Sequence, residues 1–185
     1  MFGLIRKLPK HLALAASMLI CLNLQAGKLS EPGVHKSIYV TEWAKLKHRA
    51  EIGDPEALFA LGNYYYEPPK GSSFRQNYIK SAEFYFQSGI RGNASAQYNL
   101  AIMFHRGIGV ASNYIQSYAW FKLASTNQSP VAKHVNLVSS QAVETLEPEL
   151  TPEELFKAKE LAQFYKKVVS NKRYRDAKFP EKSLR

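Results

Sequence analysis

Apolar and small residues, with one glutamine among them, recur at helical spacing in two stretches near the middle of the chain. The first stripe is Ala57, Leu58, Leu61, Gly62 and Tyr65, and the second is Ala96, Gln97, Leu100, Ala101 and Phe104. Residues at these spacings lie on one face of a helix with 3.6 residues per turn. Asp54 before Pro55, and Asn93 before the second stripe, are typical helix starts. The pattern therefore predicts an amphipathic helix in each stretch.

The two stretches belong to an internal repeat. At an offset of 39 residues, Gly53 matches Gly92, Ala57 matches Ala96, Leu61 matches Leu100, Gly62 matches Ala101 and Tyr65 matches Phe104. At an offset of 36, Asn77-Tyr78-Ile79 matches Asn113-Tyr114-Ile115, Ser81 matches Ser117, and Phe84-Tyr85 matches Trp120-Phe121. The difference of three residues is explained by a longer loop in the first copy, between Glu67 and Gln76. Two helix-pair units are the simplest interpretation of this repeat.

Three further helices are predicted outside the two units. One spans about residues 41–52, and another opens at Ser129-Pro130 and continues to about Leu146. The third begins at Thr151-Pro152-Glu153-Glu154, which is a capping-box pattern with proline in the first turn. Its apolar positions are Leu155, Ala158, Leu161, Ala162 and Tyr165. No stretch has the pattern of a β-strand, so the sequence predicts an all-α solenoid of antiparallel helix pairs.

The first 26 residues have the pattern of a secretory signal peptide. A basic start with Arg6, Lys7 and Lys10 precedes the apolar run Leu12–Leu22, and Ala26 is the small residue expected before a cleavage site. We therefore expect cleavage after Ala26 and export to the periplasm or beyond the cell. An uncleaved N-terminal anchor is the alternative. The predicted organisation is a signal peptide at 1–26, a linker at 27–40, a solenoid domain at 41–170 and a basic tail at 171–185.

Composition narrows the chemistry of the mature chain. The only cysteine, Cys21, lies in the predicted signal peptide and follows Ile20, whereas a lipoprotein signal requires a small residue there. Cleavage would leave no cysteine for a disulfide, a catalytic thiol or a thiolate metal site. The net charge of +10 is concentrated at the C-terminus, where residues 166–185 contain eight Lys or Arg and only two acidic residues. The basic character is therefore a property of the tail.

The candidate chemical motifs favour structural roles. Gly107-Ile108-Gly109-Val110 resembles a phosphate-binding loop, but neither a preceding strand nor a Gly-Lys-Ser/Thr ending accompanies it. Glycine just after a helix instead favours a left-handed C-terminal cap. His35, His48, His105 and His134 show no metal-ligand spacing, and the serines lack a nucleophile elbow. We therefore expect no enzyme activity, cofactor or metal.

The second unit, GNASAQYNLAIMFHRGIGVASNYIQSYAWFKLAS, resembles a Sel1-like repeat, a relative of the tetratricopeptide repeat. Ala, Leu, a small residue, an aromatic, Gly-x-Gly-Val and Trp-Phe occur there in the family's order. The first unit resembles it less closely, because Pro68 aligns with Gly107, and LTPEELFKAKELAQFY resembles the closing helix of small secreted bacterial members. The resemblance covers about residues 43–165. It implies a right-handed superhelix of helix pairs that binds other proteins as an adaptor or scaffold.

The resemblance also implies where a partner binds. In tetratricopeptide geometry the first helix of each unit lines the concave face, which implies a groove formed by Phe59, Asn63, Tyr66, Tyr98, Ile102 and His105. The expected partner is another protein, bound by a monomer with no transmembrane span in its mature chain, and nucleic acid is not expected. Two alternatives stay open: an envelope factor that docks on anionic polymer or lipid through its basic tail, and an envelope enzyme or its regulatory subunit. Phe74 and Arg75, in the long first loop, are either a contact point or part of a plain linker.

Overall fold

The computed structural model describes residues 32–72 and 74–171, and these fall in two units, to Ala44 and from Lys45. The predicted signal peptide lies outside the described residues, as does the tail beyond Asn171. Helix α2 (Pro32–Glu51) crosses the boundary between the units. It begins at Pro32, so residues 32–40 of the expected linker are helical. Proline is common in the first turn of a helix, but the first turn of α2 contains no acidic residue. The start of α2 therefore carries only part of the usual sequence signal.

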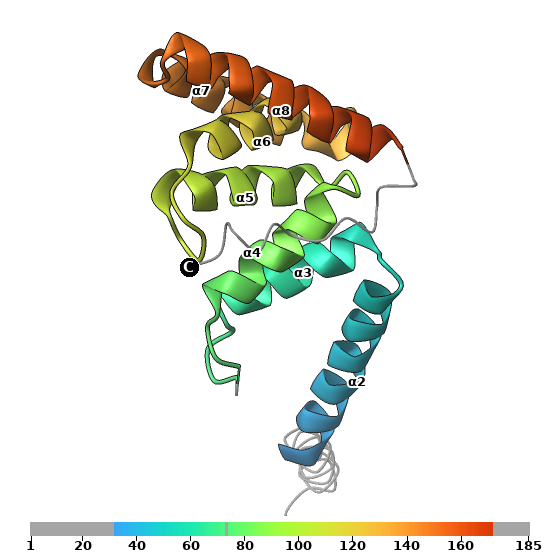
Figure 1. Ribbon diagram of the computed structural model, residues 1–185. Helices are drawn as coiled ribbons and strands as arrows, with labels where there is room; N and C mark the ends of the chain where they lie inside the picture. The colour runs from blue at the N-terminus through green and yellow to red at the C-terminus, as the bar shows by residue number, and fades with distance from the viewer. Residues whose placement is uncertain (1–31, 73, 172–185) are drawn as a thin grey trace, which may run out of the picture. The chain divides into compact units, whose positions relative to one another are not determined.

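From Lys45 onward the described residues form helices and no β-strand (Figure 1). The helices are α3 (Pro55–Tyr66), α4 (Tyr78–Gly89), α5 (Ala94–Arg106), α6 (Tyr114–Ser125), α7 (Lys133–Leu146) and α8 (Pro152–Ser170). Short 3₁₀ turns at Pro130–Ala132 and Glu147–Glu149 precede α7 and α8. The all-α prediction is confirmed. Within this part of the chain, no helix is both long enough and apolar enough to cross a membrane.

Side-chain caps confirm the helix starts predicted at Asp54, Asn93 and Thr151, whereas the helix predicted to open at Ser129 begins at Lys133, after a 3₁₀ turn and without a side-chain cap. Asp54 accepts a hydrogen bond from the backbone N–H of Glu56, and three asparagines accept one from the N–H three residues ahead: Asn77, Asn93 and Asn113. Thr151 and Glu154 form the full capping box of α8. Each cap satisfies a donor that the first turn would otherwise leave unpaired. The local sequence therefore determines where these five helices begin.

The helices stack as pairs, α3 with α4 and α5 with α6, and α4 packs on α5 (Figure 1). This arrangement confirms the α-solenoid. Both α7 and α8 then pack chiefly on α6. Trp120 lies fully buried at the centre of this last layer, with its ring 4.3 Å from that of Tyr165 and 5.7 Å from that of Phe86. Large aromatic rings therefore fill the space between α4, α6 and α8.

Buried and partly buried polar contacts hold the helices together both within and between the two pairs. Asn93 donates to the carboxylate of Glu56 over 2.8 Å, and the hydroxyl of Ser88 donates to the carbonyl of Pro55 over 2.6 Å. The amide of Gln97, fully buried, donates to the carbonyl of Gly89 and accepts from Asn127. Buried polar groups cost free energy unless they are paired in a defined geometry. The bonds of Asn93 to Glu56 and of Gln97 to Gly89 join the second pair to the first, so they favour one orientation of the pairs, whereas the bond of Ser88 to Pro55 joins α4 to α3.

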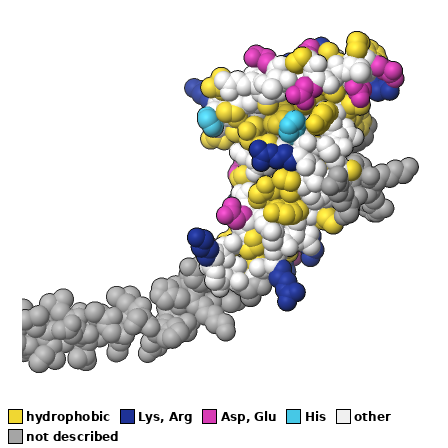
Figure 2. Space-filling model, turned by 90° about the vertical axis from the view of Figure 1, so that its left-hand side faces the viewer, with side chains coloured by type: hydrophobic (Ala, Val, Ile, Leu, Met, Phe, Trp, Pro, Cys, Tyr) yellow, Lys and Arg dark blue, Asp and Glu magenta, His cyan; other side chains and the backbone are white. Residues whose placement is uncertain are grey.

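The surface is uneven in charge. Five glutamates flank the turn between α7 and α8: Glu144, Glu147, Glu149, Glu153 and Glu154. Figure 2 shows acidic side chains at this end of the molecule on the face in view, together with basic and hydrophobic side chains, and further basic and hydrophobic side chains toward the middle. Two of these glutamates are in the first turn of α8, where the helix dipole favours negative charge.

Candidate functional site

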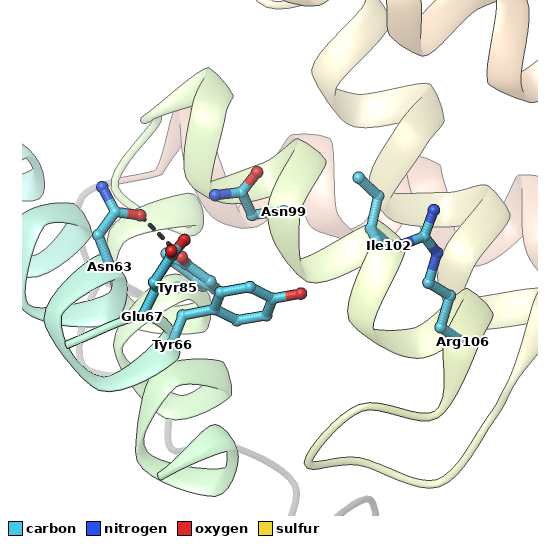
Figure 3. A pocket seen from close by; sticks show the side chains of 7 residues that line it. All are labelled: Asn63, Tyr66, Glu67, Tyr85, Asn99, Ile102 and Arg106. Atoms are coloured by element: carbon cyan, nitrogen blue, oxygen red, sulfur yellow. Dashed lines mark hydrogen bonds between the residues drawn. The ribbon is translucent and has the colours of Figure 1, made fainter. Parts of the chain in front are cut away.

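A pocket lies where the first two helix pairs meet, with a cavity volume of about 350 Å³ (Figure 3). Seven residues line it: Asn63, Tyr66 and Glu67 from α3 and its end, Tyr85 from α4, and Asn99, Ile102 and Arg106 from α5. Because α3 and α5 are the first helices of the two pairs, the pocket combines corresponding faces of both units.

Tyr85 and Asn63 form the ordered wall of the pocket. The Tyr85 hydroxyl donates a 2.7 Å hydrogen bond to Oδ1 of Asn63, and only 2% of the residue is exposed. Burial raises the pKa of Tyr85 above its ordinary value, so the phenol stays protonated and remains a donor at neutral pH. Tyr66 packs nearby, with its ring 6.5 Å from that of Tyr85. Packing and hydrogen bonding therefore hold this wall in place.

Opposite charges lie on the two sides of the pocket. Glu67 directly follows α3 and Arg106 is the last residue of α5, at positions 39 residues apart and therefore equivalent in the two units. Both residues are exposed, and Figure 3 shows them on opposite sides of the opening. The amides of Asn63 and Asn99 add groups that can both donate and accept hydrogen bonds, as a peptide backbone does. The pocket therefore combines charged and amide groups, which can bind polar groups of a ligand, with the aromatic rings of Tyr66 and Tyr85.

Comparison with known proteins identifies the repeated unit. Residues 55–93 and 94–129 each match the Sel1 repeat. The chain contains two Sel1 repeats. The 39-residue step between their starts is the offset found in the sequence, so the resemblance noted there is confirmed. Proteins built from Sel1 repeats are generally interaction modules, typically non-catalytic scaffolds that bind other proteins.

A solved structure shows the same fold. The chain is similar to the crystal structure of a protective antigen from uropathogenic Escherichia coli strains that displays an SLR fold, with 26% sequence identity and a TM-score of 0.57. The match covers 74% of this chain and 28% of that chain, so the protein spans little more than a quarter of the antigen's length. No protein of curated function matches the sequence significantly.

The structure brings three of the six predicted groove residues to the pocket: Asn63, Tyr66 and Ile102. Phe59 and Tyr98 are half-buried instead, with their rings 5.9 Å from Tyr85 and 5.5 Å from Phe121. His105 is exposed and stacks on Tyr114, 5.3 Å between ring centroids. None of these last three lines the pocket. Their part in binding a partner stays a prediction.

Four residues that line the pocket were not among the predicted groove residues: Glu67, Tyr85, Asn99 and Arg106. Tyr85 lies on the second helix of the first Sel1 repeat, whereas the groove was expected only on first helices. Its ring reaches the pocket because the neighbouring position on α3 is Gly62, where a Cβ atom would lie 2.5 Å from the ring. Glu67 and Arg106 could have been identified from the repeat, because these equivalent positions at the helix ends carry opposite charges.

The Gly-x-Gly loop of the second repeat has the structural role that the sequence favoured. Gly107 caps α5 in the left-handed conformation, with φ 67° and ψ 38°. Gly109 also has a positive φ of 69°, and a Cβ atom there would lie 2.5 Å from the backbone carbonyl of Tyr78 at the start of α4. The loop is thus pressed against the first repeat. Among the described residues, no group of three His, Cys, Asp or Glu is placed to hold a metal ion.

The long loop of the first repeat is anchored to its own helices. Gln76 donates to the carbonyl of Tyr66 over 2.7 Å, and Phe74 packs on Tyr64 with ring centroids 5.9 Å apart. Phe74 is only half-exposed. Its ring therefore packs within the repeat, whereas the neighbouring Arg75 is exposed.

Proposed function

We propose that the protein is a non-catalytic adaptor that captures an extended segment of another protein in the pocket between α3 and α5. One observation carries the proposal: two Sel1 repeats contribute to a single pocket, so the site exists only because the repeats are joined. A volume of about 350 Å³ is at the small end of ligand pockets and suits one or two side chains of a bound segment.

The lining supports a peptide ligand. Asn63 and Asn99 can pair with the N–H and C=O groups of an extended backbone, while Glu67 and Arg106 select for charge on either side. Tyr66 and Tyr85 supply rigid aromatic surface, and tyrosine and arginine are enriched at protein interfaces. The fixed Tyr85–Asn63 bond reduces the ordering that binding requires, which favours affinity.

Photo-crosslinking in the cells that produce the protein tests this function. A photoreactive amino acid placed at position 102 should give a discrete cross-linked product, whose partner peptide mass spectrometry then identifies. Leu137, 59% exposed on α7, is the matched control position outside the pocket. The product should disappear when Arg106→Glu is combined with the crosslinker at position 102. The same products from positions 102 and 137, or no effect of Arg106→Glu, would contradict the proposed site.

Export is the second part of the proposal, and the pattern of residues 1–26 supports it. The mature protein should begin at Gly27, which mass measurement of the protein recovered from cell fractions checks. Replacing Ala26 with a large residue should block processing, because the peptidase requires a small residue there. A full-length protein confined to the cytoplasmic fraction would exclude export without affecting the pocket.

A further inference from the structure

A second groove lies between α6 and α8, on a different layer of the structure from the α3–α5 pocket. Its cavity volume is about 280 Å³. Three lining residues come from the C-terminal half of α6 and its end (Lys122, Leu123 and Thr126), and four come from α8 (Lys159, Ala162, Gln163 and Lys166). Residues 159, 162, 163 and 166 follow the i, i+3, i+4, i+7 spacing of one helix face. The groove is therefore a continuous strip along α8.

Positive charge dominates the rim of this strip. Lys122, Lys159 and Lys166 line the groove, and none of its seven lining residues is acidic. Lys159 is paired with Glu147, 2.9 Å away, and this hydrogen bond holds the pKa of Glu147 below its ordinary value. Lys122 and Lys166 form no ion pair within 4 Å with any residue that the structure describes, although Lys122 also contributes to the lowered pKa of Glu147. At neutral pH the groove therefore carries a net positive charge, because one carboxylate, that of Glu147, faces two of its three lysines.

Packing does not account for the lysine on α6. The position equivalent to Lys122 in the first Sel1 repeat is Phe86, which is buried against Trp120. In the first repeat, therefore, the next layer of helices covers this position. In the second repeat the position stays open, because α8 lies beside it and leaves a groove. Leu123 and Ala162 form the apolar floor of that groove and are 6% and 7% exposed.

We propose that this groove is a second binding site, whose ligand is an acidic protein segment that carries an apolar side chain. Its carboxylates would pair with Lys122 and Lys166, and its apolar side chain would cover Leu123 and Ala162. The lining on α8 runs from residue 159 to residue 166, which is about 10 Å of helix at 1.5 Å per residue, and Lys122 adds a charge from a second helix. A site of that length fits several carboxylates along a chain better than one phosphate group. The apolar floor favours a peptide over a purely ionic polymer.

Fluorescence anisotropy with the full chain tests the site. The probe is a fluorescein-labelled peptide that repeats Glu-Glu-Leu, and the control peptide repeats Gln-Gln-Leu. Combining Lys122→Gln with Lys166→Gln should weaken probe binding about tenfold, since two exposed ion pairs are lost. Lys157→Gln, on the same helix but outside the groove and paired with Glu153, is the matched control and should leave Kd within about twofold. Circular dichroism should show all variants equally folded.

A variant that should strengthen probe binding complements the lysine variants, which should weaken it. Glu147→Gln removes the carboxylate that neutralises Lys159, so it should tighten probe binding about threefold. Unchanged binding by the double lysine variant, or equal affinity for the Gln-Gln-Leu peptide, would overturn the proposal. Vesicles of phosphatidylglycerol that compete equally well, with the same dependence on Lys122 and Lys166, would assign the groove to anionic lipid and also overturn it.

Discussion

In the first Sel1 repeat, Ser81 of the second helix donates a 2.9 Å hydrogen bond to the carbonyl of Gly62; in the second repeat, Ser117 makes the same bond to Ala101 over 3.0 Å. Both serines are fully buried. Beside this shared contact the aromatic residues are exchanged: Phe59 packs on Tyr85 in one repeat, and Tyr98 packs on Phe121 in the other. The small residue and the serine therefore fix the helix pair, and the aromatic positions are free to differ.

The differences lie on the surfaces that the repeats expose. In the first repeat the phenol on α4 reaches Asn63 and forms part of the pocket. In the second repeat the loop after α5 is short and presses on Tyr78, whereas the longer loop of the first repeat folds on its own helices. The first repeat thus contributes more of the pocket wall, and the second repeat supplies the loop that packs against the first. The repeats share a fold but not a role.

The largest expected effect comes from breaking the loop contact. Gly109→Ala places a Cβ atom 2.5 Å from the Tyr78 backbone and also requires a positive φ. Left-handed geometry and overpacking against backbone should together cost about 3 kcal/mol of unfolding free energy. The first-repeat loop offers a control, since Gly71 has φ +77° but nothing within 4 Å of its Cβ position. Gly71→Ala should cost only about 1 kcal/mol. Urea denaturation measures both, and equal losses would mean that the contact with Tyr78 contributes nothing.

The next prediction tests whether the missing side chain of Gly62 is what allows Tyr85 to reach the pocket. Gly62→Ala gives the first repeat the small residue that the second has at position 101, but its Cβ atom would lie 2.5 Å from the Tyr85 ring. The ring must shift, so we expect a loss of about 2 kcal/mol together with loss of the Tyr85–Asn63 bond. The reverse exchange, Ala101→Gly, should cost about 2 kcal/mol through lower helix propensity and the loss of a buried methyl group, without moving Tyr85. Thermal unfolding gives the stabilities, and a crystal structure that keeps Tyr85 in place would contradict the reasoning.

The helices were predictable because their signals are local. Caps such as Asn77 and Asn113 act within three residues, and apolar stripes repeat every turn, so both can be read along the chain. The position of α8 against α6 could not be predicted in this way. It depends on the fit of Trp120 to Tyr165, residues 45 positions apart, and this pairing leaves no periodic trace.

The site could be predicted only in part, because it also depends on contacts between residues that are distant in the sequence. Asn63, Tyr66 and Ile102 were predicted from the tetratricopeptide resemblance together with helical spacing, and all three line the pocket. Tyr85 does not follow from that spacing, because its place depends on the missing side chain of Gly62 on another helix. Phe59 and Tyr98 have the same spacing as the pocket residues, but their rings find aromatic partners on second helices. Spacing identifies a helix face, while the neighbouring helix determines which residues on it are accessible.

A smaller effect tests whether the shared serine contact is equivalent in both repeats. Ser81→Ala and Ser117→Ala each remove one buried hydrogen bond to a helix carbonyl, so each should cost about 1 kcal/mol. The two losses should agree, because the geometry and burial of the bonds agree. Chemical denaturation of the two variants and their combination checks this. A loss confined to one repeat would show that the pairs are held together differently.

The smallest effect concerns a ring pair at the edge of each repeat. Tyr66 packs on Tyr78 with centroids 5.2 Å apart, and the equivalent His105 stacks on Tyr114 at 5.3 Å. His105→Tyr makes the second pair chemically like the first, and because the site is exposed the stability should change by less than about 0.5 kcal/mol. His105→Ala removes the ring and should cost more, about 1 kcal/mol. If the tyrosine variant is instead as unstable as the alanine variant, the imidazole has a role in the second repeat that ring packing does not explain.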